Sequence, residues 1–312
     1  MPSIRKILSL SPHLEAAVRN VYWGSPILPT LVTRLDDRKA KRKKDRGEKP
    51  PSTSIEGIVE QLRAWGVGEG DLLLVHSGYR GIRGGKRSPD DILDQLLNLV
   101  GPHGTLCLPS IPYWPEAPKL YDRFVVDYND IVLDYDPEVT PAWTGAVANA
   151  MIKRPQAVRS LHPLNTMAAI GPMAVDMVKN DLNGERPFPN GPQSSWRFCY
   201  DNDAWIVAMG ADMAHSLTMI HLAEDYLGEQ WPVEDWYRDR RFRVKIDGAW
   251  QEKVVRERHP RWARYYGERT LSRDLIAAGI TRRVQLDGVN VELLRTRELI
   301  DYLNRRNHTL YP

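Results

Sequence analysis

Apolar and polar positions first recur in a regular way after residue 52. Apolar residues at 55, 58, 59 and 62 have helical spacing, and Thr53 and Glu56 stand ahead of them in capping-box spacing. This pattern predicts a helix that ends near Gly66. The apolar run that begins the segment Leu72–Ser77 has turn residues before and after it, which is typical of a strand buried on both faces.

The next elements complete a βαβ unit. After a glycine-rich stretch over 78–87, Ser88 and Pro89 suit the N-cap and first turn of a helix, and Gly101 suits its end. Residues 105–108 then form a second short apolar run, closed by Pro109. Strand, glycine loop, helix and strand in this order predict parallel pairing of the two strands.

The second half of the chain adds further elements. We expect a capped helix over 140–155, a buried strand over 204–210, and a helix over 217–227 with Ser216 as its N-cap. Asp-Gly pairs at 247–248 and 287–288 lie within segments of alternating polarity, which predicts two hairpins over 242–255 and 284–293. The fold class is therefore α/β, with an antiparallel hairpin appendage near the C-terminus.

Length and composition bound the class of protein. The 312 residues, 42% of them hydrophobic, are enough for one large domain or two modest ones with a substantial core. No apolar run approaches the ~20 residues of a membrane-spanning helix, and the first residues do not resemble a signal peptide, so we expect a cytoplasmic protein. Two cysteines, Cys107 and Cys199, cannot build a disulfide framework and are expected to be buried thiols.

The positive charge is concentrated in one segment. The net charge is +3, but residues 38–49 alone carry eight Lys or Arg and two acidic residues, so the rest of the chain is mildly acidic. The segment leads into Pro50 and Pro51, and we interpret it as a solvated linker that separates an N-terminal extension, 1–52, from a domain over 53–312. A contact with phosphates is the alternative. The chain has no nucleic-acid-binding motif, so no nucleic-acid partner is predicted.

His221 and Glu224 are the first candidates for chemistry. Three residues apart on the predicted helix after the strand over 204–210, they project from one face near the carboxyl end of a sheet, where open α/β sheets bind ligands. A carboxylate that orients an imidazole makes it a suitable general base. Asp225 is a competing partner, and a plain surface pair is the alternative. A second such set for a metal is not evident, so no metal is predicted.

Two further segments contain candidate site residues. Ser77 opens the glycine-rich loop, whose Gly84 and Gly85 could present backbone amides to a phosphate or pyrophosphate. The spacing matches neither the dinucleotide-binding nor the P-loop motif, and Ser77 lacks the surroundings of an esterase nucleophile. His162, followed by Pro163, is either a second polar wall of the site or a buried structural histidine.

Taken in order, these segments are more specific than any one of them. GDLLLVHSGYRGIRGG, LLNLVGPHGTLCLPS, TPAWTGAV, VRSLHPLNTMAAIGP, GPQSSWR and MIHLAED together resemble the aminoglycoside 3-N-acetyltransferase family. The resemblance covers about 53–227, with looser similarity to the C-terminus. It implies an acyl-CoA-dependent N-acyltransferase with a three-layer α/β/α core and a mixed, partly parallel sheet.

The resemblance also implies roles for individual residues. His221 matches the family's catalytic base and Glu224 the residue that orients it, while Ser77 and Ser110 match residues that line the CoA channel. His162 matches a His-Pro motif. Together with His162, two acidic residues are candidate contacts to the acceptor, namely Asp212 and Asp225. This sequence departs from the family pattern at three places, namely Gly78, the segment 109–111 and the loop 212–215.

The acceptor amine is the open question at this point. The basic extension favours an anionic, nucleotide-linked amino sugar of surface-polysaccharide biosynthesis, and an aminoglycoside, as in antibiotic resistance, is the alternative. Acetyl-CoA or another acyl-CoA is expected as co-substrate, without a metal. A rival from another class is a non-enzymatic module whose basic segment binds polyanions. A homo-oligomer is possible.

Overall fold

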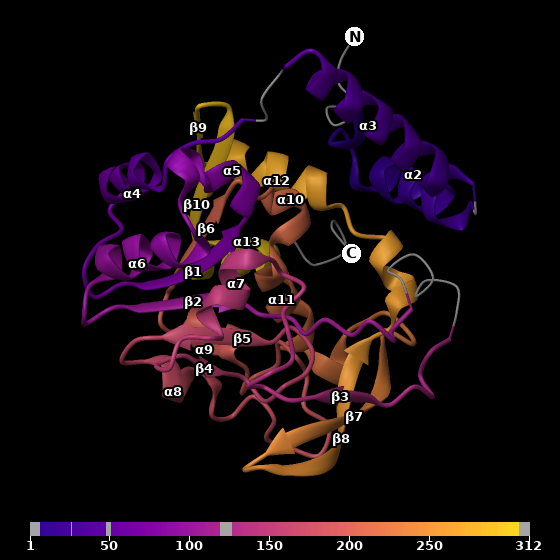
Figure 1. The fold of residues 1–312 in the computed structure, drawn as a ribbon. Coiled ribbons are helices and arrows are strands. Elements are labelled where there is room, and N and C mark those ends of the chain that lie inside the picture. The colour runs from indigo at the N-terminus through magenta and orange to yellow at the C-terminus, as the bar shows by residue number, and fades with distance from the viewer. Residues whose placement is uncertain (1–6, 26, 48–50, 119–126, 306–312) are drawn as a thin grey trace.

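The computed structural model describes residues 7–25, 27–47, 51–118 and 127–305 (Figure 1). Two sheets organise these residues: a large one with strand order β4-β5-β2-β1-β6-β10-β9 and a small one with order β3-β7-β8. The strands of the large sheet are β1 Leu72–Ser77, β2 Thr105–Pro109, β4 Val158–Arg159, β5 Met167–Ile170, β6 Trp205–Met209, β9 Arg282–Leu286 and β10 Val289–Arg295.

The large sheet is parallel at its centre and antiparallel toward its margins. Strand β1 pairs in parallel with both β2 and β6, as the βαβ unit predicts. Strands β5 and β10 then pair antiparallel with β2 and β6. The predicted mixed, partly parallel sheet is thus confirmed.

Helices cover both faces of this sheet (Figure 1). On β1, Leu73 and Val75 pack into one apolar core, and Leu72 and Leu74 pack into the other, because successive strand side chains point to opposite faces. The three-layer α/β/α core is therefore confirmed. The first core is shared with α4 Ile55–Ala64, α6 Pro89–Val100 and α7 Ala146–Met151, and the second with α8 Ala174–Val178, α9 Ser195–Asp201, α12 Glu268–Ala277 and α13 Thr296–Arg305.

The N-cap of one helix is the residue that the sequence predicts, and the N-cap of another lies one residue further along the chain. Helix α6 has a capping box, in which Ser88 Oγ accepts from the Asp91 amide and the Asp91 carboxylate accepts from the Ser88 amide. Helix α4 is capped by Ser54 rather than by Thr53. The Thr53 hydroxyl instead donates to Asp287 at 2.9 Å, a partner far along the chain.

Two predicted helices are shorter than expected. The helix predicted over 140–155 is reduced to α7, because the Asn149 side chain bonds both backbone groups of Ala142 and holds that residue in a loop. The helix predicted over 217–227 is divided into η3 Thr218–Ile220 and α11 His221–Asp225, and a separate short helix, α10 Met213–Ser216, precedes it.

Both Asp-Gly hairpins are present. At both turns the Asp and Gly have positive φ, +50° and +79° at the first and +49° and +78° at the second, as type I′ turns require. The first hairpin, β7 Tyr237–Ile246 and β8 Ala249–Arg258, joins β3 Leu133–Tyr135 in the small sheet. The second hairpin, β9 and β10, is instead the edge of the large sheet, so only the first is an appendage.

The N-terminal extension is helical. Helices α2 Pro12–Gly24 and α3 Leu28–Asp45 lie side by side (indigo in Figure 1), and α2 packs on α12 and on η5 Pro260–Arg264. The interpretation of the basic segment as a linker is therefore wrong as far as Asp45, although its described side chains are exposed. No helix in the described ranges has the length and apolar character needed to cross a membrane. The remaining short helices are α5 Tyr79–Ile82, η1 Gly84–Lys86 and η4 Gly228–Gln230.

Candidate active site

His221 and Glu224 form the predicted pair at the start of α11. His221 Nδ1 lies 3.2 Å from Glu224 Oε1, and the imidazole packs edge-on against Tyr266 with ring centroids 5.3 Å apart. Because the carboxylate accepts from Nδ1, the lone pair of the neutral ring is at Nε2. Nε2 has no hydrogen-bond partner among the described residues. The pair therefore has the geometry of a proton acceptor.

Glu224 is held by more than the histidine. Its side chain is buried, and Oε2 accepts from the Tyr266 hydroxyl at 3.0 Å and from Arg258 Nη1 at 3.3 Å. Burial opposes ionisation, but the charges of His221 and Arg258 outweigh it and lower the pKa of Glu224 below its ordinary value. Glu224 is thus a carboxylate at neutral pH that can stabilise a positively charged imidazole.

Asp225, the competing partner, points elsewhere. It is buried, with Oδ2 accepting from the Asn190 amide at 2.9 Å and Oδ1 from the Tyr237 hydroxyl at 3.0 Å. Burial raises the pKa of this carboxyl group. Both oxygens are used inside the protein, so the structure places Asp225 in a structural position. Its contact with an acceptor stays a prediction that this arrangement does not favour.

A cavity of about 330 Å³ lies at the carboxyl ends of β1 and β2. Ser77, a predicted CoA contact, ends β1 and lines it together with His76. Pro109, which ends β2, also lines it, as do Trp143 and Thr144 ahead of α7. The lining is mostly apolar with a few polar groups, which suits an acyl chain on a flexible arm. The other lining residues are Val75, Leu108, Ile111, Gly145, Ala148, Ala211, His215, Ser216 and Thr218.

Ser110 lies behind this cavity rather than in its wall. Its side chain is buried, and its hydroxyl accepts from Arg159 Nε at 3.1 Å. The same guanidinium donates to the backbone carbonyls of Ser110 and Thr140. The cavity is lined by the two residues next to Ser110 in the chain, Pro109 and Ile111, but not by Ser110 itself. A direct contact of Ser110 with CoA stays a prediction.

The glycine-rich loop does not form an open cradle. Gly84 and Gly85 lie in η1, and the Gly84 amide already donates to the Thr53 carbonyl at 3.0 Å. A Cβ at position 84 would lie 2.5 Å from that same carbonyl oxygen, so glycine is required there by packing. Gly84 is not among the described residues that line the three cavities treated in this section. The predicted contact of these glycines with phosphate gains no support from this geometry.

Gly78, where the family pattern has a second serine, has a comparable explanation. A Cβ at this position would lie 2.0 Å from the Gly210 carbonyl oxygen, at the end of the neighbouring strand β6. The Gly78 amide donates to Met209 at 2.9 Å. The departure therefore reflects a close approach of two backbones.

His162 is buried, in agreement with its interpretation as a structural histidine. Its side chain is 1% exposed, Nδ1 accepts from the Leu164 amide at 3.1 Å, and Nε2 lies 3.2 Å from the Pro187 carbonyl. Burial lowers its pKa to about 4. This satisfied, neutral histidine supports the loop it belongs to, and a direct contact with the acceptor stays a prediction.

His76 is a cavity residue to which the sequence analysis assigned no role. It is 6% exposed and lines the 330 Å³ cavity. Its Nε2 is buried and has no partner among the described residues. Burial lowers the pKa of His76 to about 4, so the ring is neutral at physiological pH. The signal in the sequence was its position next to Ser77 at the end of a central strand.

A second, smaller cavity of about 70 Å³ contains the candidate base. His221 lines it together with Glu268, and three residues, His215, Ser216 and Thr218, line both this cavity and the larger one. The two cavities thus share a wall, with Ser77 on one side and His221 on the other.

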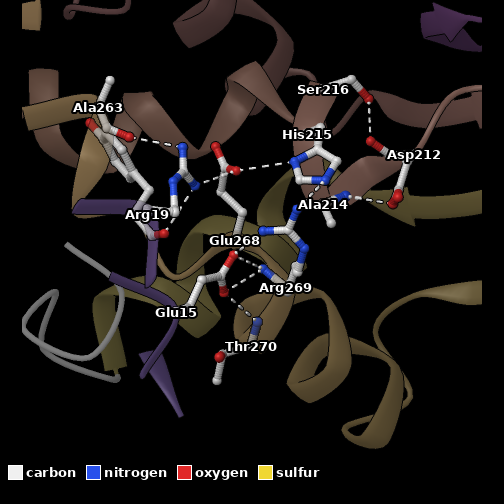
Figure 2. A network of polar contacts seen from close by, with 11 residues as sticks. Glu15, Arg19, Asp212, Ala214, His215, Ser216, Ala263, Glu268, Arg269 and Thr270 are labelled. Carbon is white, nitrogen blue, oxygen red and sulfur yellow. Dashed lines mark hydrogen bonds and ion pairs between the residues drawn. The ribbon is translucent and has the colours of Figure 1, made fainter. Parts of the chain in front are cut away.

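His215 is the centre of a polar network in this wall (Figure 2). Its Nδ1 lies 3.3 Å from Glu268 Oε2, and its Nε2 lies 3.1 Å from Arg269 Nη2. Since a guanidinium only donates, Nε2 accepts and the ring proton is on Nδ1. Arg19, from α2, donates to the same Glu268 oxygen at 2.7 Å. Both ring nitrogens of His215 are therefore occupied.

Glu15 connects the N-terminal extension to the same network (Figure 2). It is completely buried and accepts from Arg269 Nη1 at 2.9 Å. It also accepts from the backbone amides of Arg269 and Thr270, in the first turn of α12. The N-cap residue of α12, Gly267, makes no side-chain cap, so Glu15 supplies one from a distant helix. No local sequence pattern points to this contact.

Asp212 has a local role. Its Oδ1 accepts from the Ala214 amide at 3.1 Å and caps α10. Ser216, the predicted N-cap of a helix over 217–227, is instead the last residue of α10. Asp212 lines a third cavity of about 260 Å³ beside α12 and Ser9, not the two that contain Ser77 and His221. Its contact with an acceptor stays a prediction.

The cysteines are free and buried, as predicted, with their Sγ atoms 4.0 Å apart. Burial raises the pKa of Cys107, so its thiol stays protonated. Within the described ranges, no group of three or more His, Cys, Asp or Glu is placed to hold a metal ion.

Comparison with known proteins identifies the family. The family described as aminoglycoside 3-N-acetyltransferase matches residues 74–306. Aminoglycoside N(3)-acetyltransferase VII of Streptomyces paromomycinus is 27% identical over 273 residues, which cover 78% of this chain and 88% of that protein. Aminoglycoside N(3)-acetyltransferase VIII of Streptomyces fradiae is 28% identical over 268 residues, with the same coverage of 78% and 88%.

Solved structures share the fold. Aminoglycoside acetyltransferase AAC(3)-Xa superposes with a TM-score of 0.65 at 21% identity, covering 89% of this chain and 99% of that one. The AAC-IIIb binary complex with CoASH gives a TM-score of 0.63 at 19% identity, covering 83% and 99%. With the sequence match over 74–306, these findings show that the chain belongs to the aminoglycoside 3-N-acetyltransferase family and is an N-acetyltransferase.

Proposed function

We propose that this protein transfers an acyl group from an acyl-CoA, in the first place acetyl-CoA, to an amine of an aminoglycoside, with His221 as the general base. The observation that carries the proposal is the open Nε2 of His221, whose Nδ1 is bonded to Glu224 at 3.2 Å, in a cavity that shares a wall with a larger one. Membership of the acetyltransferase family supports it.

The chemistry needs such a base. An amine with a pKa near the lysine value of about 10.4 is protonated at neutral pH and cannot attack a thioester until a proton is removed. His221 Nε2 takes this proton, and the carboxylate of Glu224 stabilises the resulting imidazolium. The amine nitrogen then bonds to the thioester carbonyl carbon and the carbon–sulfur bond breaks. The second proton of the attacking nitrogen passes to the departing sulfur, so the products are an amide and CoA thiol.

The larger cavity is the proposed place for the acyl-CoA arm. Its apolar lining by Pro109, Ile111 and Trp143 suits the methylene groups of the arm, and Ser77 and Thr144 offer polar groups for its amides. His76 provides a neutral ring whose Nε2 is without a partner within the described part of the chain. This placement brings the thioester toward the wall next to His221.

The acceptor is proposed to be an aminoglycoside rather than a nucleotide-linked amino sugar. The basic segment that favoured the anionic acceptor lies on α3 as far as Asp45, and none of its described side chains lines either of the two cavities. Glu268, in the cavity with His221, is an ionised carboxylate: burial opposes its ionisation, but His215 and Arg19 lower its pKa. A negative charge beside the base favours a cationic acceptor. The relatives reported above are aminoglycoside acetyltransferases.

The test is a turnover assay with defined acceptors. Acetyl-CoA is mixed with a panel of aminoglycosides or with UDP- and dTDP-amino sugars, and thiol release is followed for the wild type, His221→Ala and His103→Ala. His103 is exposed and outside both cavities, so its variant is a matched control.

The expected result is thiol release with aminoglycosides that is lost in His221→Ala and kept in the control. Turnover with sugar nucleotides alone would contradict the acceptor assignment. Full activity of His221→Ala would instead contradict the role of His221 and leave the acceptor assignment intact. Salt-sensitive binding of polyanions without any turnover would support the non-enzymatic alternative.

A further inference from the structure

The two N-terminal helices expose apolar side chains at helical spacing. On α2, Leu14, Val18 and Val21 follow one another at intervals of four and three residues, so they form one stripe, and all three are exposed. Helix α3 has a stripe of the same kind. Its exposed apolar residues are Leu28, Leu31, Val32 and Leu35.

The apolar stripe of α3 continues as a basic one. Lys39 and Arg42 stand four and seven residues after Leu35, so they extend the same face toward the C-terminal end of the helix, and both are exposed. The segment 38–49 carries eight Lys or Arg against two acidic residues. One exposed face is therefore apolar for two turns and then strongly basic.

Another face of α2 is attached to the body of the protein. On α2, Glu15 is buried against the first turn of α12, and Arg19 donates to Glu268 and to the carbonyls of Ala263 and Tyr266. Helix α3 packs on α2 (Figure 1). The contacts of Glu15 and Arg19 anchor α2, and neither residue belongs to its apolar stripe.

Only one of the common binding partners suits both halves of this face. A nucleic acid would pair with the basic half but gains nothing from exposed leucines. A second copy of the chain would cover the apolar half but would bring two segments of high positive charge together. An anionic lipid bilayer takes apolar side chains into the boundary of its acyl chains and attracts Lys and Arg to its headgroups.

We propose that the α2–α3 pair is a docking surface for an anionic lipid membrane, with the stripe Leu28–Leu35 in the interface and the basic half of α3 over the headgroups. The proposal does not depend on the acyl-transfer function. The pair rests on the membrane surface, and the contacts of Glu15 and Arg19 hold the catalytic body beside it.

The experiment uses the full-length protein and lipid vesicles. Co-sedimentation is measured with neutral phosphatidylcholine vesicles and with vesicles that contain about 30% phosphatidylglycerol, at about 0.1 M and about 0.5 M salt. Two variants test the two halves of the face, Leu31→Ser/Leu35→Ser and Arg38→Gln/Arg42→Gln. Each variant has a matched control at exposed residues outside α2 and α3. Val139→Ser/Val175→Ser is the control for the apolar half, and Arg63→Gln/Lys153→Gln is the control for the basic half. Circular dichroism and thiol release check that every variant is folded.

We expect at least about tenfold more binding to the anionic vesicles than to the neutral ones, with a decrease at the higher salt concentration. Each α3 variant should lower the binding at least about fivefold, and each control should leave it unchanged. The proposal is wrong if folded wild-type protein does not bind the anionic vesicles at the lower salt. It is also wrong if both α3 variants bind as the wild type does.

Two further outcomes would show that the face binds a second copy of the chain or a nucleic acid instead of a membrane. Dimers that Leu31→Ser/Leu35→Ser abolishes, without any vesicle binding, would show that a second copy covers the apolar stripe. Binding to RNA that only the arginine variant weakens, again without vesicle binding, would assign the basic half to a nucleic acid. Either result would overturn the membrane proposal.

Discussion

Two histidine–carboxylate pairs lie at the same wall and have almost the same geometry. His221 is 3.2 Å from Glu224 and His215 is 3.3 Å from Glu268, yet their second ring nitrogens differ. Nε2 of His215 accepts from Arg269, whereas Nε2 of His221 has no partner among the described residues. A carboxylate partner therefore does not by itself make a base, because the other nitrogen must also be open to the substrate.

The carboxylates of the two pairs also accept hydrogen bonds from different parts of the chain. Glu224 is bonded by Arg258 and Tyr266 of the acetyltransferase body, within the part of the chain that the family match covers. Glu268 is bonded by Arg19, which lies on a helix before the matched residues. The first pair is thus supported by residues that the family match covers, and the second is supported in addition by the N-terminal extension.

The largest expected effect separates the two histidines. His221→Ala should lower kcat by about 10²–10⁴-fold, the range for a lost general base, with the KM for acetyl-CoA nearly unchanged. His215→Ala should lower kcat by less than about tenfold, because both nitrogens of His215 are already bonded within the protein. Steady-state thiol release gives both values. Equal losses of kcat in the two variants would show that an open Nε2 does not distinguish the two histidines.

Two other histidines, His76 and His162, are buried without a carboxylate partner among the described residues. They predict how the stability of the fold changes at acidic pH. Burial lowers the pKa of His76 and His162 from the ordinary 6.5 to about 4. The unfolded chain takes up these protons near pH 6.5 and the folded chain only near pH 4. Stability is therefore lost as the pH falls through this window, by about 3 kcal/mol for each histidine.

Urea denaturation between pH 7 and pH 4.5 measures this loss. Replacement of one of these histidines, for example His162→Gln, should reduce the slope of stability against pH by up to half. A variant slope as steep as that of the wild type would show that other groups cause the acid lability.

The carboxylate of the catalytic pair should have an intermediate effect. Glu224→Gln keeps the shape but loses the charge that stabilises the imidazolium, so the base becomes weaker and the loss of activity should be smaller than in His221→Ala. We expect this loss in kcat, with a shifted pH–rate profile. The matched variant Glu268→Gln should leave the pH–rate profile unchanged. A shift in the profile of Glu268→Gln alone would move the base to the other pair.

The smallest expected effect concerns the N-terminal anchor. Arg19→Ala removes a largely buried guanidinium that bonds Glu268, and a hydrogen bond to a charged group contributes about 1.5–3 kcal/mol. We discount this for partial exposure and expect a loss of about 1 kcal/mol in the free energy of unfolding, with kcat within about threefold of the wild type. Chemical denaturation and the thiol assay measure the two quantities. A large loss of kcat without a loss of stability would give the extension a catalytic part.

The sequence patterns that succeeded are short in range. The buried strand Leu72–Ser77, the Ser88–Asp91 capping box and the two Asp-Gly turns depend on residues within a few positions of one another. The pairing of His221 with Glu224 is of the same kind, since a separation of three residues on a helix brings the side chains together. These features were predictable because local spacing decides them.

Three features of the structure differ from what the sequence patterns indicated. The helix over 217–227 was interrupted, and Asp212 rather than Ser216 caps the segment before it. The basic segment formed a helix as far as Asp45, although its composition resembled a linker. In the glycine-rich loop, Gly84 is packed against the backbone of Thr53, a contact that the glycine spacing did not indicate, and the phosphate contact of the loop stays a prediction. Of these outcomes, the contact between Gly84 and Thr53 joins residues that a window of a few positions does not contain.

The amino-acid order by itself determined the α/β class, the central βαβ unit and the identity of the candidate base with its carboxylate. The tertiary structure alone decided which of two histidine–carboxylate pairs has an open nitrogen, because Arg269 reaches His215 across 54 residues of chain. It also decided that Glu15 caps α12 across a separation of 254 residues. Such contacts form only when the packing of whole helices brings their ends together, and no local spacing encodes them.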